Sequence, residues 1–279
     1  MPILQTADTP LYYEIAGDGS PVLFIQGVGV VGEGWRPQVD TLREEFRTMI
    51  FDNRGIGKSQ PCTVRLTIED MARDAKALMD AAGWERAHVV GHSMGGLIAQ
   101  QLALDHPGRV RSLSLLCTFA EGREAARLTP WTLWMTLRTR LGTRRMRRRA
   151  FVEMLASPAE LESLDKDACA AMLTPLLGRD PADQPPILMR QLMALRGHHA
   201  FPSLGKLAGI PTLVISASQD RIARVAFGKR LAAAIPGAAF EEWDRAAHGM
   251  SILQAAAVNE RLRRFFRQAE EQAPGSGNP

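Results

Sequence analysis

The sequence predicts an α/β fold: a mostly parallel central sheet with helices on both faces and a helical insertion in its second half. Three observations lead to this prediction. Short apolar segments alternate with helical segments over residues 10–118 and 206–268, which is typical of parallel strands joined by crossover helices. Residues 119–205 contain no convincing strand. The 279 residues suffice for one large domain with an insertion.

The first part of the chain contains most of the predicted strands. They are expected over residues 11–15, 22–26, 46–52, 88–92 and 110–117. Turn-forming residues at 17–21 separate the first two strands and predict a hairpin. Apolar residues at helical spacing predict helices over residues 67–82, with Gly83 as its stop, and 94–105.

After residue 118 the alternation stops and later returns. Residues 119–205 are rich in Leu, Met, Arg and Ala and are predicted to form a helical insertion. Strands are then expected over residues 211–216 and 238–243, and helices over 225–234 and 252–267. We therefore expect a core of residues 1–118 and 206–268, a cap of residues 119–205 and a flexible tail of residues 269–279.

Composition narrows the function classes. Hydrophobic residues make up 46% and charged residues 23%, as in ordinary globular proteins. The formal net charge is +4, part of it concentrated in the arginine-rich residues 138–149, which is weak support for nucleic-acid binding. Cys62, Cys117 and Cys169 are widely spaced and form no metal or disulfide pattern. No apolar run could span a bilayer and no signal peptide is visible, so we expect a soluble cytoplasmic protein.

The most informative motif is Gly91-His92-Ser93-Met94-Gly95, which fits G-x-S-x-G. In this pattern a sharp turn from strand to helix pushes the serine outward in a strained conformation, and flanking glycines avoid clashes across the turn. An apolar strand precedes the motif and a predicted helix follows it, as the pattern requires. We identify Ser93 as the candidate nucleophile. The helix N-terminus adds a positive dipole end where an oxyanion would form.

A serine nucleophile needs a base, and the base needs an orienting carboxylate. His248 lies in the loop between the last predicted strand and helix, and is the candidate base. Asp220 follows the strand at 211–216, where a carboxylate sits at the functional edge of the sheet. Glu121 and Asp244 are rivals for the acid.

The other five histidines are given lesser roles. His92 adjoins Ser93 and is expected to point away from the position of the base. His88 begins a strand and His106 ends a helix, so both are interpreted as structural. His198 and His199 lie in the insertion and either line the pocket or are exposed.

Together these residues resemble the α/β-hydrolase fold family, and within it compact esterases and enol-lactonase-like enzymes. The resemblance covers about residues 10–118 and 206–268, and includes the turn at residues 52–59 (Asp-Asn-Arg-Gly-Ile-Gly-Lys-Ser). It implies the order serine, acid, histidine, and a cap after the sixth core strand. It also implies two oxyanion donors, the backbone N–H groups of Met94 and Val28. The family usually has His-Gly before the second donor, where this chain has Gln26-Gly27.

Two phosphate-binding patterns compete with this interpretation. Gly27, Gly29 and Gly32 fit G-x-G-x-x-G after a strand, with Asp52 ending the next strand, as in dinucleotide-binding folds. However, Gly34 and Pro37 delay the required helix, and Asp52 belongs to the 52–59 turn. The Gly-Lys-Ser at 57–59 lacks the first glycine of a P-loop, because position 52 is Asp.

The basic residues 138–149 are predicted to form a solvated helical face, with attraction of an anionic substrate as the alternative. Apolar residues of the cap would form a wall over Ser93 or ordinary core: Trp131, Trp134, Met135, Met154, Leu155, Met172, Leu173, Leu176, Met189 and Met193.

We therefore predict a serine hydrolase acting on a carboxylic ester or lactone of a small molecule through an acyl-enzyme, with no metal or organic cofactor. Alternatives are C–C bond hydrolysis, cofactor-free perhydrolysis or a lyase reaction at the same site, a non-catalytic ligand receptor, and a dinucleotide-dependent oxidoreductase. The sequence indicates no nucleic-acid or membrane partner and leaves the oligomeric state open.

Overall fold

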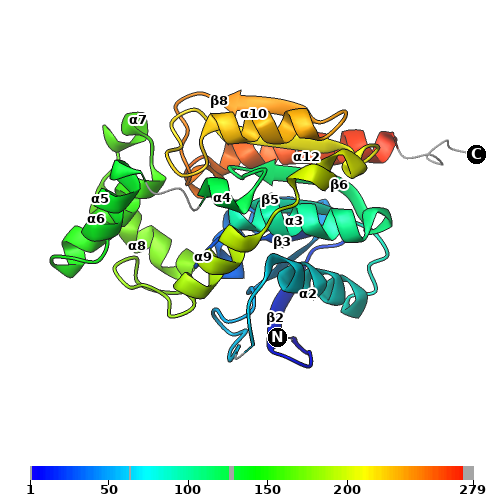
Figure 1. The fold of residues 1–279 in the computed structure, drawn as a ribbon, viewed down its shortest axis with the longest axis horizontal. Helices are drawn as coiled ribbons and strands as arrows, with labels where there is room; N and C mark the ends of the chain where they lie inside the picture. Colours follow the sequence, from blue (N-terminus) through cyan, green and yellow to red (C-terminus); the bar gives the residue numbers. More distant parts are fainter. Residues whose placement is uncertain (1, 63, 126–128, 273–279) are drawn as a thin grey trace, which may run out of the picture.

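The computed structural model describes residues 2–62, 64–125 and 129–272. Its centre is an eight-stranded sheet with the order β1-β2-β4-β3-β5-β6-β7-β8 (Figure 1). The strands are β1 (Ile3–Gln5), β2 (Pro10–Ala16), β3 (Ser20–Ile25), β4 (Phe46–Phe51), β5 (Ala87–His92), β6 (Val110–Leu116), β7 (Thr212–Ala217) and β8 (Ala239–Trp243). From β4 to β8 every neighbouring pair is parallel, so the mostly parallel sheet is confirmed.

The predicted hairpin between the first two long strands is wrong. β2 pairs antiparallel with β4, and β3 pairs parallel with the other edge of β4, so β4 separates the two strands. The reason is that the connection after β3 carries the chain through a helix and back to a position between them. The turn at Gly17 and Gly19 packs on the end of the next helix: a Cβ on Gly17 would lie 2.2 Å from the carbonyl oxygen of Arg43.

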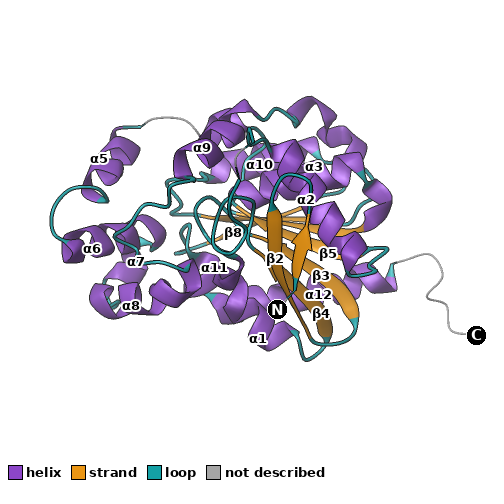
Figure 2. Ribbon diagram, turned by 90° about the horizontal axis from the view of Figure 1, so that it is seen from below, coloured by secondary structure: helices purple, strands orange, loops and turns teal. Residues whose placement is uncertain are grey.

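Helices cover both faces of the sheet (Figure 2). One face carries α1 (Arg36–Leu42), α11 (Met250–Leu253) and α12 (Ala255–Glu271), and the other α2 (Ile68–Ala81), α3 (Met94–Asp105) and α10 (Val225–Ala234). The short 3₁₀ helices η1 (Gly32–Trp35), η2 (Pro107–Arg109) and η3 (Phe201–Leu207) complete the connections. The strands between these layers are largely apolar; in β7 all six residues are buried, as expected of strands covered on both sides.

The described part of the segment between β6 and β7 contains helices and no strand, as predicted. The helices are α4 (Gly122–Ala125), α5 (Pro130–Arg138), α6 (Arg144–Leu155), α7 (Pro158–Leu161), α8 (Lys166–Leu177) and α9 (Leu188–Gly197). α5 to α8 gather beyond one end of the sheet (Figure 1). α6 and α8 pack together through a small separate core that includes Phe151, Val152 and Leu173.

Some elements lay outside the prediction. The short edge strand β1 and the helix α1 were missed, since Gly34 and Pro37 obscured the helical pattern; Pro37 instead occupies the first turn of α1, where proline is tolerated. α12 continues to Glu271 and so takes in the first residues of the predicted tail; 273–279 lie outside the described residues. Among the helices of the described residues, none combines the length and apolar character that a bilayer crossing requires.

Candidate active site

The turn between β5 and α3 holds Ser93 in a strained backbone conformation. Ser93 has φ 55° and ψ −120°, a region that residues with a side chain rarely adopt. Two glycines make the turn possible. A Cβ on Gly91 would lie 2.3 Å from the carbonyl oxygen of Gly95, and a Cβ on Gly95 would lie 2.1 Å from that of Ile25. The motif glycines are therefore required by close backbone approach, as predicted from the sequence.

Ser93 lies at the end of a chain of hydrogen bonds with His248 and Asp220. Ser93 Oγ is 3.1 Å from His248 Nε2, and His248 Nδ1 is 2.7 Å from Asp220 Oδ2. All three residues are buried. The structure thus brings together the serine, histidine and aspartate identified in the sequence, from three loops at the carboxyl ends of β5, β7 and β8.

The groups around the Asp220 carboxyl favour its ionised form. Burial opposes its charge, but His248 and the N–H groups of Ile222 and Ala223, 2.7 and 2.8 Å from Oδ1, together lower the pKa of the Asp220 carboxyl below its ordinary value. The two rival acids are engaged elsewhere. Asp244 accepts a hydrogen bond from Ser218, and Glu121 forms an ion pair with Arg230.

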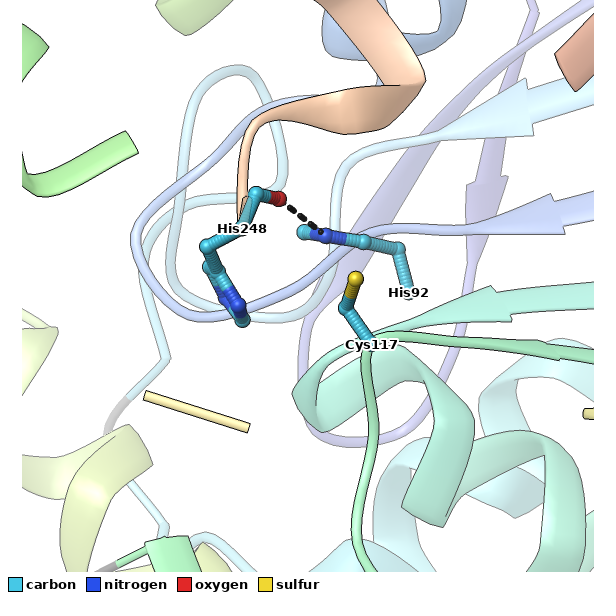
Figure 3. Close-up of side chains that lie close together, drawn as sticks. All are labelled: His92, Cys117 and His248. Carbon is cyan, nitrogen blue, oxygen red and sulfur yellow. Dashed lines mark hydrogen bonds between the residues drawn. The ribbon is translucent and has the colours of Figure 1, made fainter. Parts of the chain in front are cut away.

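The sequence suggested that His92 points away from the base, and this expectation is wrong. Its ring lies beside that of His248, with 4.8 Å between the ring centroids. Its Nε2 donates to the backbone carbonyl of His248 at 2.9 Å (Figure 3). Burial is the main reason that the pKa of His92 falls to about 3. His92 is therefore neutral and supports the loop that carries His248.

His92, Cys117 and His248 form a compact group of possible metal ligands, with donor atoms within 4.8 Å of one another (Figure 3). The chemistry of these donors does not suit a metal. His248 directs one ring nitrogen to Asp220 and the other to Ser93, and His92 uses Nε2 as a donor. Burial raises the pKa of the Cys117 thiol well above its ordinary value, whereas a metal needs the thiolate.

The two amides expected to stabilise an oxyanion are available. Among the described residues, neither the Met94 nor the Val28 N–H group has an acceptor in the chain. Met94 is the first residue of α3, whose opening amides have no helical partner. The loop that carries Val28 is held by side chains: Gln26 Oε1 accepts from the Gly27 N–H at 2.9 Å, and Gln191 Oε1 from the Gly29 N–H at 2.8 Å.

A cavity of about 480 Å³ opens beside Ser93 and His248. Its lining is mostly apolar: Val28, Val30, Phe119, Phe151, Met154, Leu155, Leu177, Leu188, Met189, Leu192, Leu195, Ile222 and Ile252. Of the apolar residues expected in the helical insertion, Met154, Leu155 and Met189 line this cavity, while Leu173 lies in the small core between α6 and α8. Five polar side chains of the segment between β6 and β7 also line it: Thr136, Thr139, Arg140, Arg179 and Gln184. Arg140 belongs to the basic run 138–149, for which attraction of an anionic substrate was the alternative. The other four were missed, because no local pattern marks them.

The competing dinucleotide interpretation is not supported by the loop after β3. Asp52, which would bind a ribose, is buried and accepts hydrogen bonds from the N–H groups of Gly32 and Lys58, both at 2.8 Å. The loop glycine Gly27 faces the serine instead: a Cβ there would lie 3.1 Å from Ser93 Cβ. Asp52 therefore ties two turns together, as the resemblance to the hydrolase turn implied.

The arginine-rich residues 138–149 are largely paired with acidic neighbours. Arg144 and Arg148 contact Asp180, and Arg145 and Arg149 contact Asp167. This agrees with the predicted solvated face. Of the two histidines of the insertion left open, His198 is buried 3.1 Å from Glu69 and His199 is exposed; neither lines the cavity.

Comparisons with known proteins agree with this geometry. The family model described as "alpha/beta hydrolase fold" matches residues 20–255. The chain is 32% identical to the "Putative carbamate hydrolase RutD" of Azorhizobium caulinodans, over 97% of this chain and 100% of the relative.

Solved structures give the same result. The enol-lactonase from Burkholderia xenovorans LB400 is 26% identical with a TM-score of 0.78, covering 95% of this chain and 100% of that chain. Est816, an N-acyl homoserine lactone degrading enzyme, is 25% identical with a TM-score of 0.78 and the same coverage. The chain therefore belongs to the α/β-hydrolase family, as its motifs predicted.

Proposed function

We propose that the chain hydrolyses a carboxylic ester or lactone of a small molecule, with Ser93 as nucleophile. The hydrogen-bonded series Ser93–His248–Asp220 is the observation that carries this proposal. In the first step Ser93 Oγ attacks the substrate carbonyl carbon while His248 Nε2 takes its proton. The C–O bond then breaks as His248 returns that proton to the leaving alkoxide, which gives an acyl-enzyme.

A water molecule completes the cycle. His248 Nε2 removes a proton from the water, the resulting hydroxide attacks the acyl carbon, and Ser93 leaves with the proton from His248. The Asp220 carboxylate holds His248 in the tautomer whose Nε2 is free to accept a proton. The Met94 and Val28 amides stabilise the oxyanion in both steps, and removal of one such donor typically costs about 2.7–4 kcal/mol of transition-state stabilisation.

We assign the helices between β6 and β7 to a cap, residues 119–205, on a core of residues 1–118 and 206–268. The mostly apolar cavity of about 480 Å³ between them favours a small organic substrate. Cys62, Cys117 and Cys169 are free in the structure, which suits the reducing cytoplasmic compartment that we propose. The enzyme would need no metal or organic cofactor for this reaction.

The first experiment is hydrolysis of a panel of p-nitrophenyl esters by the wild type and by Ser93→Ala, with intact mass measured after treatment with a fluorophosphonate. We expect turnover and a single adduct, both lost in Ser93→Ala. An adduct without turnover would direct the search to lactones, carbamates and C–C substrates. Absence of both would contradict the proposal and favour a ligand receptor.

A further inference from the structure

Arg179 lies in the loop between α8 and α9 and has no carboxylate partner within 4.0 Å among the described residues. Its Nη2 donates to the carbonyl oxygen of Gly29 at 3.2 Å, and its Nη1 has a long contact of 3.5 Å with the carbonyl oxygen of Asp180. Its Nε is buried without an acceptor. The nearest acid in sequence, Asp180, is already bound by Arg144 and Arg148. Arg179 is thus a partly buried cation satisfied only by neutral groups.

Such an arrangement costs stability unless something else offsets it. Burial disfavours an unpaired charge, and it lowers the pKa of Arg179, although Asp183 and Asp180 act in the opposite direction from farther away. A guanidinium nevertheless stays protonated in proteins. The guanidinium carbon Cζ of Arg179 lies over the Phe151 ring, 5.7 Å from its centroid, and this cation–π contact offsets part of the cost. The remaining donor capacity points to an anion that the chain itself does not supply.

The position of Arg179 connects it to the proposed reaction. Arg179 lines the same cavity as Ser93 and His248, and the exposed Arg140 is also part of that lining. No aspartate or glutamate is found among the described residues that line the cavity. The cavity therefore combines mostly apolar walls with two cations and no counter-charge, which favours entry of an anion.

Arg179 and Ser93 contact the same loop, the one that follows β3. Arg179 donates to the carbonyl oxygen of Gly29, and Gly27 packs against Ser93. An anionic group held by Arg179 would therefore lie in the same cavity as a carbonyl placed at Ser93.

We propose that Arg179 binds a carboxylate of the substrate, so that the natural substrate is an acidic ester or lactone whose carboxylate and cleaved carbonyl lie in this one cavity. This inference rests on the proposed hydrolase function and adds a substrate class to it. The guanidinium offers a planar pair of donors that matches a carboxylate. Arg179 is a specificity-determining residue, and it takes no part in the proton transfers.

The test compares acidic and neutral esters of one carbon chain. Monomethyl and dimethyl esters of succinate, glutarate and adipate are hydrolysed by the wild type and Arg179→Met, with acid release followed by pH-stat and the diester rates halved for their two equivalent bonds. The wild type should prefer one of the monoesters. Arg179→Met should lose about 10- to 100-fold in kcat/KM for that monoester, the range expected for a charge-assisted hydrogen bond, and change less than threefold for its diester.

Arg264→Met is the matched control, because Arg264 is exposed on α12 and outside the cavity; it should change neither rate. Arg179→Lys keeps the charge without the fork and should retain part of the preference. Equal rates for monoester and diester in the wild type would overturn the proposal. An equal loss for both esters in Arg179→Met would do the same, because it would mark a structural role for the Gly29 contact.

A binding measurement separates this proposal from the failure of ester hydrolysis. Glutarate is titrated calorimetrically into Ser93→Ala and into Ser93→Ala/Arg179→Met, neither of which needs to turn over. We expect binding to Ser93→Ala that weakens at least tenfold in the double variant. If no ester is cleaved but glutarate binds in this way, the hydrolase proposal fails and the anion site stands. If glutarate binds neither protein, or both equally, the anion site is refuted.

Discussion

The buried neutral His92 should make the protein less stable in mild acid, and His92→Gln should remove this effect. Burial is the main cause that lowers the pKa of His92 from its ordinary 6.5 to about 3. The unfolded chain therefore binds a proton at His92 below pH 6.5, and the folded chain does not until about pH 3. Between these values the free energy of unfolding falls as pH falls, by about 1.4 kcal/mol per pH unit from this group.

The assay is urea denaturation of the wild type and His92→Gln between pH 8 and 5. Glutamine keeps an N–H donor for the His248 carbonyl but cannot titrate in this range. Relative to its value at pH 8, the free energy of unfolding of the wild type minus that of the variant should fall by about 2 kcal/mol at pH 5. His199→Gln, at an exposed position, is the control for a general loss of a histidine. A difference for His92→Gln that does not change with pH would refute a neutral buried His92.

Two further predictions concern backbone approach and buried charge. Gly95→Ala should abolish esterase activity and destabilise the fold by about 1–3 kcal/mol or more, since its Cβ would lie 2.1 Å from the Ile25 carbonyl oxygen; retained activity with an unchanged melting temperature would contradict the tight turn. Asp74→Ala should cost about 3–5 kcal/mol, because it leaves the buried Arg54 guanidinium without the carboxylate now 2.5–2.6 Å away. Lys76→Met, which breaks the more exposed pair with Asp80, should cost less than about 1 kcal/mol in the same chemical denaturation experiment.

The candidate site could be predicted from the sequence because local chain geometry encodes most of it. The glycines around Ser93 are needed by the turn itself, so the motif carries its own structural reason. Asp220 and His248 could be placed because parallel strands end at the same edge of a sheet, where the loops that follow them meet. The amides of Met94 and Val28 were named from the resemblance to the α/β-hydrolase family.

The parts that could not be predicted depend on contacts between distant segments. The turn between β2 and β3 has the composition of a hairpin, yet β4 lies between the two strands, and no residue near the turn signals that insertion. His92 was expected to point away from the base. Its bond to the His248 carbonyl could not be foreseen, because it joins loops 156 residues apart. Nothing in the sequence distinguishes Arg179 from the other arginines. It is partly buried without a carboxylate partner among the described residues, and the tertiary fold determines which carboxylates lie within reach.

Asp220 and Arg179 differ in how their charge is balanced. Asp220 is fully buried and satisfied from within: His248 and two backbone amides surround its oxygens. Arg179 donates only to neutral carbonyl oxygens. Most of the arginines of residues 138–149, by contrast, pair with Glu153, Asp167, Asp180 and Asp183. A charge that serves proton transfer must hold its geometry in every step, so internal partners suit it. A charge that recognises a substrate must be free before the substrate arrives, and the open donors of Arg179 meet that requirement.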